Sequence, residues 1–524
     1  MIRENDMKRW IVIFQLVQTA FLVACSTSET ISEGRDSPRS HIAGSHVFGP
    51  PADFIGSSLP DIGHAGLLPE REAKSTRIAI LGNGDDSFAA RIRTLKAADT
   101  SIRIQALIFT ADESGQYIAR ILKEKKAQGL DVRVIVDAFS NPSFQTQNLY
   151  FDLKQWGIEV EGYEAMLLQW LNEVPVPKLI PHVDPNQLDM RFHEKMWIID
   201  GETDHGVAIA GGLNIANEYF RIDPRSPDGN WRDQDIILQG ALVKDMVTAF
   251  DRNFEYFVGV KKSRGILNTN LYWEVTRKVL DETGRIAFHF DADPRLEKRV
   301  RELAGRKLQL NFHPARARFF QNRPRYRETY IEQAYLQLID SASREILIAN
   351  AYFVPTPNII NALHGAARRC VSIVLLTNSP QTNDLPEITL VGRGHYKALL
   401  RVNAEPAVAV CNPPAGIQIW EWQGKKAGAR QSDGTMHSKF AVFDRDYALV
   451  GSFNLDPRSA KLNSESAVVF RSGVLAGELA DIMLFRDLTF AKRITGSEAN
   501  AFEEPRDVIY RFRKSLGELF EKEL

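Results

Sequence analysis

The chain has 524 residues, of which 44% are hydrophobic and 25% charged, and its formal net charge at pH 7 is -1. This balance is that of an ordinary globular protein, and the length suits two to four domains. Because positive and negative charges nearly cancel, no global field draws the chain toward nucleic acid or anionic lipid. A nucleic-acid function would therefore have to rest on a local basic patch.

The first 25 residues are typical of a secretory signal. A basic flank precedes an apolar run from residue 10 to residue 24, which is shorter than the roughly 20 residues needed to span a bilayer. The run ends in Leu-Val-Ala-Cys at residues 22–25, which resembles a bacterial lipobox and implies acylation of Cys25. The alternative is a short uncleaved anchor. We expect an exported lipoprotein of a bacterial envelope with a periplasmic body, and Ser26 favours the outer membrane.

The other two cysteines, Cys370 and Cys411, make neither a disulfide framework nor a metal-binding spacing. They could form a bridge in an oxidising compartment. We expect them instead to be two small core residues without a bond between them.

Residues 26–76 are rich in Ser, Gly and Pro, which predicts a flexible tether. From about residue 77, strand and helix patterns alternate. Strands are expected over 101–109, 131–137 and 157–160, and a helix over 115–128. This order predicts βαβ units and a mainly parallel sheet.

The second half of the chain repeats this order. Helices are expected over 330–342 and 359–369, with strands over 345–353, 371–377 and 416–419. Repeated elements of this kind predict an α/β fold of two duplicated lobes. We place these lobes at residues 77–260 and 312–490, with a mostly helical connector at 261–311 and a helical tail at 491–524.

Each lobe carries the pattern His-x-Lys-x4-Asp. The two copies are His193, Lys195 and Asp200, and His437, Lys439 and Asp444. Alternate residues of a strand share a face, so each histidine should point with its lysine. The residues between and after them should point into a core, namely Met196, Ile198, Phe440 and Val442. The odd spacing of the two aspartates from the lysines favours a structural role for them, so they rank below the other candidate catalytic residues.

A glycine-rich turn and then an acidic residue follow each motif. The turn residues are Asn214 in the first lobe and Ser452 and Asn454 in the second, and the acids are Asp233 and Glu465. Two such sets facing each other suit a phosphodiester. One imidazole can attack phosphorus and form a phosphohistidine, while the other protonates the departing oxygen. The lysines and the turn residues can hold the phosphate oxygens, and the acids can orient the histidines.

The lysines supply positive charge, so we expect neither a metal nor a cofactor. Water as the acceptor of the phosphoryl group would make the protein a hydrolase, and an alcohol would make it a transferase. Because the repeat supplies both motifs in one chain, no obligate protein partner is implied.

The paired motifs resemble those of the phospholipase D superfamily over about residues 77–490. Segments 211–220, 231–235 and 350–355 are most similar to the bacterial C-type cardiolipin synthases. The resemblance implies two α-β-α sandwich lobes with the active site at their interface, and transfer of a phosphatidyl group between membrane phospholipids. It also implies that His193 is the nucleophile and His437 the acid. The first motif departs from the family pattern, since Gly212 replaces a serine and four extra residues precede Gly211.

Three further segments allow more than one interpretation. Arginines at 316, 318, 323, 325 and 327 could bind lipid headgroups or nucleic acid, or form a solvated basic loop. They keep open an exported nuclease, although nucleic acid is not the substrate we expect. The apolar run at 166–171 could contact acyl chains, but core packing is expected. Residues 505–524 are predicted to be an amphipathic packing helix. A catalytically inactive lipid-binding scaffold is the remaining alternative.

Overall fold

The computed structural model describes residues 68–503 except for 138–139, 142, 164–190, 224–229, 264–289, 327 and 426–433. The predicted signal with Cys25, nearly all of the predicted tether, the apolar run at 166–171 and the segment 505–524 therefore lie outside the described residues. Among the residues that are described, no helix is both long and apolar enough to cross a membrane.

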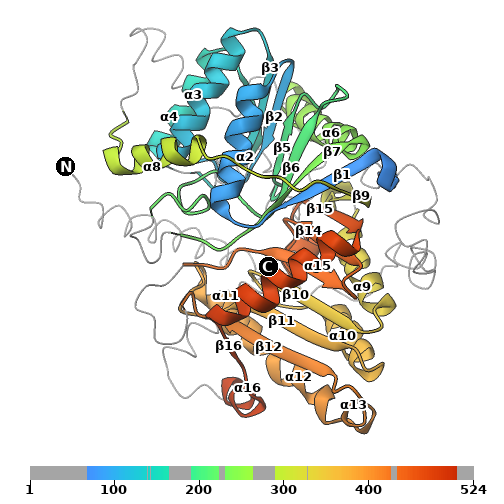
Figure 1. The fold of residues 1–524 in the computed structure, drawn as a ribbon. Coiled ribbons are helices and arrows are strands. Elements are labelled where there is room, and N and C mark those ends of the chain that lie inside the picture. Colours follow the sequence, from blue (N-terminus) through green and yellow to red (C-terminus); the bar gives the residue numbers. More distant parts are fainter. Residues whose placement is uncertain are drawn as a thin grey trace, which may run out of the picture. The chain divides into compact units, whose positions relative to one another are not determined.

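The first lobe is an eight-stranded sheet in the order β4-β3-β2-β5-β6-β7-β1-β8, with helices on its faces (Figure 1). Its elements are β1 (Thr76–Leu81), α2 (Gly84–Ala97), β2 (Ser101–Gln105), α3 (Glu113–Ala127), β3 (Asp131–Asp137), α4 (Phe144–Gln155), β4 (Glu159–Tyr163), β5 (Met196–Ile199), β6 (Val207–Gly211), β7 (Asp235–Gly240), α6 (Ala241–Ser263), α8 (Pro294–Ala304) and β8 (His313–Pro314).

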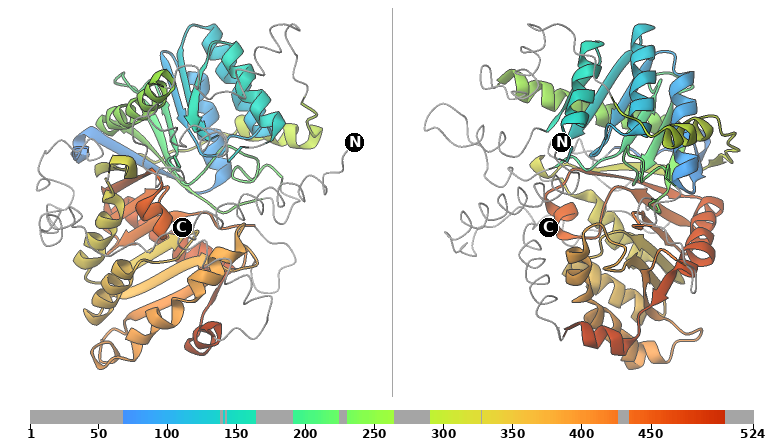
Figure 2. Two further views of the ribbon diagram at one scale, coloured as in Figure 1. Left: turned by 180° about the vertical axis from the view of Figure 1, so that it is seen from behind. Right: turned by 90° about the vertical axis from the view of Figure 1, so that its left-hand side faces the viewer.

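The second lobe is also built on eight strands, in the order β16-β12-β11-β10-β13-β14-β15-β9 (Figure 2). Its elements are β9 (Arg316–Asn322), α9 (Tyr330–Ser341), β10 (Glu345–Asn350), α10 (Pro357–Arg368), β11 (Ser372–Asn378), α11 (Pro386–Arg393), α12 (Tyr396–Leu400), α13 (Pro406–Ala409), β12 (Gly416–Trp422), β13 (Lys439–Phe443), β14 (Tyr447–Gly451), α14 (Pro457–Lys461), β15 (Glu465–Arg471), α15 (Gly473–Asp481), β16 (Ala491–Arg493) and α16 (Gly496–Glu503).

The two sheets correspond strand for strand from β4 to β1 and from β12 to β9. In each, three strands run parallel and the motif-bearing strand, β5 or β13, pairs antiparallel with the first of them. The predicted duplicated α/β fold is confirmed. The lobe boundaries shift, because β8 completes the first sheet beyond residue 312 and β16 extends the second sheet beyond residue 490.

Helix starts in both lobes follow local capping chemistry. Asn83, Asp112, Ser143 and Thr356 each accept a hydrogen bond from a backbone N–H in the first turn of the helix that follows. A polar N-cap of this kind satisfies a donor that the helix itself leaves unpaired. Pro357 at the start of α10 adds a residue whose fixed backbone suits the first helical position. These caps fix where each helix begins on its sheet.

The strands β5 and β13 alternate as the sequence predicts. Met196, Ile198, Phe440 and Val442 are each at most 2% exposed and belong to one hydrophobic core, which also contains residues of α6 and α15. Burying a large apolar side chain contributes about 1.5–3 kcal/mol. Because this core draws on both sheets, the lobes are packed together and not merely tethered.

A buried polar cluster also joins the lobes. Glu194, the middle residue of the first motif, accepts hydrogen bonds from Asn253 of α6 and from Gln321 of β9 in the second lobe, at 3.0–3.2 Å. Glu194 and Gln321 are fully buried. A buried carboxylate is stable only when it is hydrogen-bonded, so this cluster favours one arrangement of the lobes.

The expectation that Cys370 and Cys411 are unbonded core residues is wrong. They form a disulfide with a Cα–Cα distance of 5.5 Å. Cys370 is exposed at the end of α10, where its φ of 65° turns the chain, and Cys411 follows α13. The disulfide fastens the α11–α13 segment to α10.

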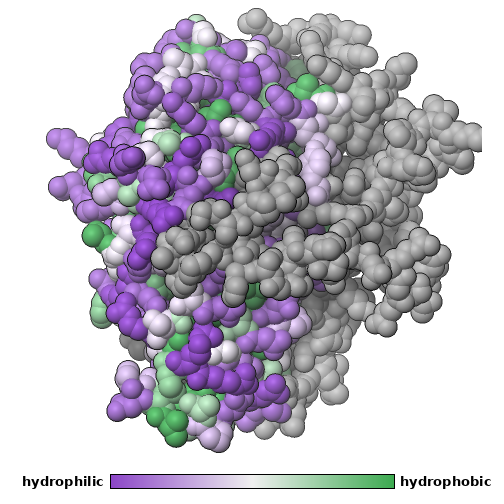
Figure 3. Space-filling view, turned by 90° about the vertical axis from the view of Figure 1, so that its right-hand side faces the viewer, coloured by the Kyte–Doolittle hydropathy of each residue, from purple (hydrophilic) through white to green (hydrophobic). Residues whose placement is uncertain are grey.

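Large exposed apolar side chains are dispersed over the described surface. They include Phe144 on α4, Val410 after α13 and Phe485 after α15, which are 72–79% exposed. On the face drawn in Figure 3, hydrophilic residues predominate around scattered apolar ones. Single apolar residues of this kind are ordinary on a soluble surface and carry no functional argument.

Candidate active site

Each motif histidine is held by backbone hydrogen bonds from the other lobe. The His193 N–H donates to the Ser464 carbonyl at 2.8 Å, and the His437 N–H donates to the Arg232 carbonyl at 2.7 Å. Parallel bridges Phe192–Ser464 and Arg232–Met436 accompany these bonds. The two motifs therefore lie together at the lobe junction, as the repeat predicts.

Each histidine side chain also contacts an acidic side chain of the other lobe. His193 Nδ1 lies 2.9 Å from both carboxylate oxygens of Glu465, and His437 Nδ1 lies 2.8 Å from Asp233 Oδ2. All four side chains are less than 10% exposed. Each lobe thus supplies one histidine and the acid that orients the other lobe's histidine, so neither lobe contains a complete half-site.

Each lysine side chain returns to the backbone of its own histidine; His193, Lys195 and His437 precede the strands β5 and β13, so the expected strand alternation does not reach them. Lys195 Nζ donates to the His193 carbonyl and Lys439 Nζ to the His437 carbonyl, at 2.5 and 2.7 Å. Burial lowers the pKa of Lys195 to about 7 and that of Lys439 to about 8, although nearby carboxylates oppose the shift. Both lysines act on both histidines, so the site concentrates positive charge where a phosphate could be bound.

Glu465 is held as a carboxylate by many donors. Besides His193, it accepts hydrogen bonds from the hydroxyls of Ser452 and Ser459 and from the Asn463 amide. Burial alone would raise the pKa of Glu465, but His193, Lys195 and the Ser452 hydroxyl lower it below its usual range.

Asp233 has a poorer set of donors. Apart from His437, it accepts from the Gln234 N–H at 2.8 Å. Burial raises the pKa of Asp233 to about 8, because Lys439 and Arg232 only partly offset the cost of burying its charge. A β-carbon added at Gly212 would lie 2.6 Å from Asp233 Oδ2, so a serine there, in the position of Ser452 in the second lobe, would displace the Asp233 carboxyl group.

Burial dominates the titration of the histidines. It lowers the pKa of His193 to about 4 despite the opposing charge of Glu465. It also lowers the pKa of His437 below its usual range, with Lys439 and Lys195 adding to the shift and the Gly212 carbonyl opposing it. Both rings are therefore neutral near pH 7, and their tautomers are set by the acids on Nδ1.

The three residues predicted to bind phosphate differ in their surroundings. Asn214 donates from Nδ2 to the Tyr219 hydroxyl at 2.9 Å and accepts from the Ile108 N–H. The Ser452 hydroxyl donates to Glu465, so it supports the histidine-orienting acid, which differs from the predicted role. The side-chain oxygen of Asn454 is buried and has no hydrogen-bond partner among the described residues, so it could accept a hydrogen bond from a ligand hydroxyl.

The motif aspartates lie at the opposite ends of β5 and β13 from the lysines. Asp200 accepts from the N–H groups of residues 99–101 and from the Thr100 hydroxyl, and Asp444 accepts in the same way from residues 343–345 and the Ser343 hydroxyl. Both adopt positive φ, 51° and 53°, in the turn after the strand. These contacts support the structural role that the spacing of both aspartates favours.

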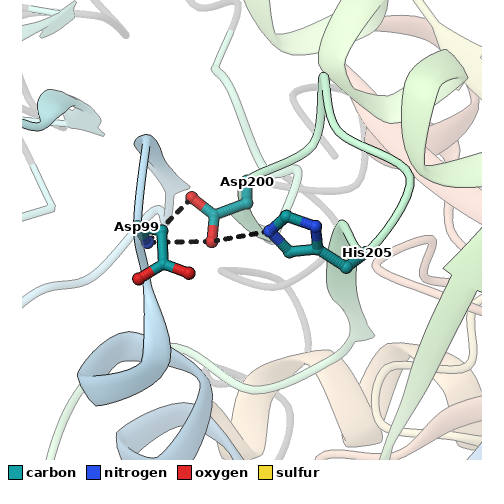
Figure 4. Close-up of side chains that lie close together, drawn as sticks. All are labelled: Asp99, Asp200 and His205. Atoms are coloured by element: carbon teal, nitrogen blue, oxygen red, sulfur yellow. Dashed lines mark hydrogen bonds and ion pairs between the residues drawn. The ribbon is translucent and has the colours of Figure 1, made fainter.

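Asp200 also lies near Asp99 and His205, whose side chains together have the spacing of a metal-binding group (Figure 4). The Asp200 oxygens already accept hydrogen bonds from four donors, and the His205 side chain is 65% exposed. The hydrogen bonds that Asp200 accepts from the backbone at the start of β2 account for the position of this cluster.

Three aromatic rings surround His437, and the sequence analysis did not assign them. The ring centroids of Tyr219, Trp231 and Tyr352 lie 5.2, 5.4 and 6.3 Å from the imidazole centroid. The Tyr352 hydroxyl donates to Asp384. All three residues fall in the segments that carry the family resemblance, and that resemblance could have pointed to them.

The arginine cluster is largely engaged in internal contacts. Arg316 pairs with Glu70, Arg318 donates to the Leu68 carbonyl, and Arg323 makes a two-pronged ion pair with Glu328. Arg327 lies outside the described residues. The internal contacts of these three arginines weaken the observation that kept a nuclease open.

Two duplicated lobes that share one pair of buried, acid-oriented histidines define a phospholipase D-type enzyme fold. The family model described as "Cardiolipin synthase, PLD-like domain" matches residues 92–257 and 335–484. The chain belongs to this family.

Curated relatives agree with that membership. The chain is 29% identical over 392 residues to a cardiolipin synthase of Geobacillus thermodenitrificans, which covers 75% of this chain but only 62% of that protein. It is 25% identical over 471 residues to an uncharacterized protein of Helicobacter pylori, covering 86% of this chain and 84% of that one. The chain thus spans under two thirds of the cardiolipin synthase it matches.

A solved structure shares the fold. The phosphatidylserine synthase of Haemophilus influenzae superposes with a TM-score of 0.54 at 16% identity, covering 87% of this chain and 95% of that chain. At this identity the likeness concerns the fold alone.

Proposed function

We propose that the protein is a phosphatidyltransferase of the cardiolipin synthase type, acting on membrane phospholipids through a phosphohistidine. The observation that carries the proposal is the pair of hydrogen bonds between the lobes, in which His193 contacts Glu465 and His437 contacts Asp233. Two buried lysines, Lys195 and Lys439, lie near both imidazoles. The similarity to a cardiolipin synthase supports a phospholipid substrate.

The different acids support His193 as the nucleophile. With Glu465 ionised, the only proton on the neutral His193 ring belongs on Nδ1, where it is donated to the carboxylate. The Nε2 lone pair is then free to attack phosphorus, with the leaving alkoxide departing on the opposite side. This arrangement agrees with the role implied by the family resemblance.

The same reasoning supports His437 as the acid. With Asp233 protonated, the carboxyl proton is donated to Nδ1, so the neutral His437 ring carries its own proton on Nε2. That proton passes to the leaving oxygen as its bond to phosphorus breaks, while the Asp233 proton shifts toward Nδ1. In the second step the pair takes a proton from the acceptor hydroxyl, which attacks the phosphohistidine and frees His193.

Charge on the phosphate oxygens is balanced by the lysines. A bound phosphate favours the charged form of Lys195 and Lys439, whose pKa values burial has lowered. Asn214 and Ser452 have partners of their own, so the Asn454 NH2 group is the neutral donor that we propose for a phosphate oxygen.

We also propose an exported protein, lipidated at Cys25. The Cys370–Cys411 disulfide supports export, since disulfides persist in oxidising compartments and are rare in the cytosol. Mass spectrometry of the protein from membranes tests this: the mature chain should begin at an acylated Cys25, and a Cys25→Ala protein should be released from the membrane.

The decisive experiment uses purified, detergent-solubilised full-length protein with phosphatidylglycerol and phosphatidylethanolamine, with products identified by mass spectrometry. Cardiolipin formation that is lost in His193→Ala supports the proposal. Phosphatidic acid as the sole product means a hydrolase with water as acceptor. No turnover of lipid would overturn the proposal in favour of DNA cleavage that needs both histidines, or of an inactive lipid-binding scaffold.

A further inference from the structure

A buried ion pair joins the lobes directly beside the active site. Arg232, just before Asp233, donates from Nε and Nη2 to the two carboxylate oxygens of Asp487, at 2.8 Å each. Arg232 is 5% exposed and Asp487 1%. Asp487 lies in the short helical segment 487–490 of the second lobe, beyond residue 484, where the family match ends.

The other hydrogen bonds that Arg232 makes with described residues lead to the His437 half-site. Its Nη1 donates to the Asp233 carbonyl at 2.6 Å, and its own carbonyl accepts from the His437 N–H at 2.7 Å. Its N–H donates to the Thr435 carbonyl at 2.8 Å. One residue thus fixes the backbone on both sides of the Asp233–His437 hydrogen bond.

The other half-site shows why such an anchor is needed here. Glu465 is oriented by the side chains of Ser452, Ser459 and Asn463 from its own lobe. Within the described part of the chain, no comparable side chain donates to Asp233 apart from His437, and a β-carbon at position 212 would meet the Asp233 carboxyl group. The direction of the Asp233 carboxyl group must therefore come from its backbone, which Arg232 holds.

We propose that Arg232 and Asp487 are positioning residues that align Asp233 with His437 across the lobe junction, and so control proton transfer to the leaving group. The inference rests on the proposed function. Groups that support a catalytic side chain in this way typically change activity about 10- to 100-fold when removed.

The test compares Arg232→Gln and Asp487→Asn with a matched control, Arg393→Gln. Arg393 makes an equally two-pronged pair with Glu421, at 2.8 and 2.7 Å, but within the second lobe. Each variant is assayed for lipid transfer and for the p-nitrophenol burst from bis(p-nitrophenyl) phosphate, a substrate whose leaving group needs no proton. Thermal melting is measured for all three.

A positioning role predicts that both site variants lose lipid transfer about 10- to 100-fold in kcat with KM little changed, yet keep the p-nitrophenol burst. Arg393→Gln should lower the melting temperature without this split. Equal losses of transfer and burst, or site variants that behave like Arg393→Gln, would overturn the proposal. If Arg232→Gln fails to fold, the near-isosteric Asp487→Asn decides alone. A wild-type protein without either activity would refute the proposed function instead.

Discussion

The two half-sites of this molecule share a backbone plan but differ in the chemistry around their acids. His193 faces Glu465, which three side-chain donors hold ionised, whereas His437 faces Asp233, which burial favours in its protonated form. Duplication alone would give two equivalent histidines. The difference arises one step away, where Ser452 in one lobe corresponds to Gly212 in the other.

The comparison shows that the tautomer of a histidine can be set by a residue that contacts only the acid beside that histidine. An ionised acid requires the ring proton on Nδ1 and leaves Nε2 free to attack, while a protonated acid leaves the ring proton on Nε2. Two histidines with identical sequence motifs can therefore take opposite roles. A change in one half-site can therefore be judged against the equivalent change in the other.

The largest effects should follow removal of the rings. His193→Ala and His437→Ala should each lower lipid transfer by at least about a thousandfold, since one loses the nucleophile and the other the proton donor. With bis(p-nitrophenyl) phosphate, His437→Ala should still release one equivalent of p-nitrophenol and trap a phosphohistidine. His193→Ala should give no burst. A burst in His193→Ala instead would reverse the assignment.

Replacing the acids by amides should separate the half-sites next. Glu465→Gln should reduce kcat by about 100-fold or more, because a neutral amide no longer stabilises the charge that develops on His193. Asp233→Asn should cost about as much, because the asparagine NH2 can orient Nδ1 but, unlike the protonated carboxyl group, cannot pass a proton to it as His437 gives up its Nε2 proton. The p-nitrophenol burst from bis(p-nitrophenyl) phosphate separates the variants: Asp233→Asn should keep it, because that leaving group needs no proton, whereas Glu465→Gln should lose it. Equal bursts would contradict the inferred roles of the two half-sites.

Much of this arrangement was predictable from the sequence. The strands that follow both motifs and the duplication could be predicted from period-two patterning and a repeated order of elements. The structural role of Asp200 followed from its odd spacing. Such inferences succeed because each depends on neighbours in the sequence or on a comparison of two copies.

The failures have a common physical cause, which is contact between distant residues. The sequence near each motif does not indicate that each acid contacts the histidine of the other lobe. It also does not indicate that the Ser452 hydroxyl donates to Glu465 instead of to a phosphate. The Cys370–Cys411 bond spans 41 residues, and Arg316 is neutralised by Glu70 from far upstream. Long-range partners of this kind become visible only once the sheets are assembled.

The pH dependence should show the Asp233–His437 pair. Asp233 has a raised pKa of about 8, so the pair holds its proton below that value and loses it as the pH rises. We expect kcat to fall above about pH 8, approaching tenfold per pH unit. Asp233→Asn should abolish this limb. Lys195 and Lys439 also titrate near here, but bound phosphate raises their pKa values, so their loss should appear in KM.

Substitutions at the two equivalent turn positions, 452 and 212, should have smaller effects. Ser452→Ala removes one of four partners of Glu465 and should lower kcat by about tenfold or less. Gly212→Ser should be the more harmful change, because its β-carbon would meet Asp233 Oδ2 at 2.6 Å and displace the carboxyl group from His437. Transfer kinetics and melting temperatures test the order, and a harmless Gly212→Ser would show that Asp233 is not fixed.

The smallest effect on catalysis should come from the motif aspartates, where the halves are alike. Asp200→Asn and Asp444→Asn each weaken a cap on three backbone N–H groups and should cost about 1–3 kcal/mol of stability, with kcat within about twofold of wild type. Burial opposes the shift, but these donors lower the pKa of both aspartates. Their stabilisation is therefore present above the unfolded pKa and is lost as the pH falls through the lowered folded value. Urea unfolding at neutral and acid pH should show both variants converging on wild type in acid. A large loss of kcat in a folded variant would mean that the motif aspartate acts in the chemistry after all.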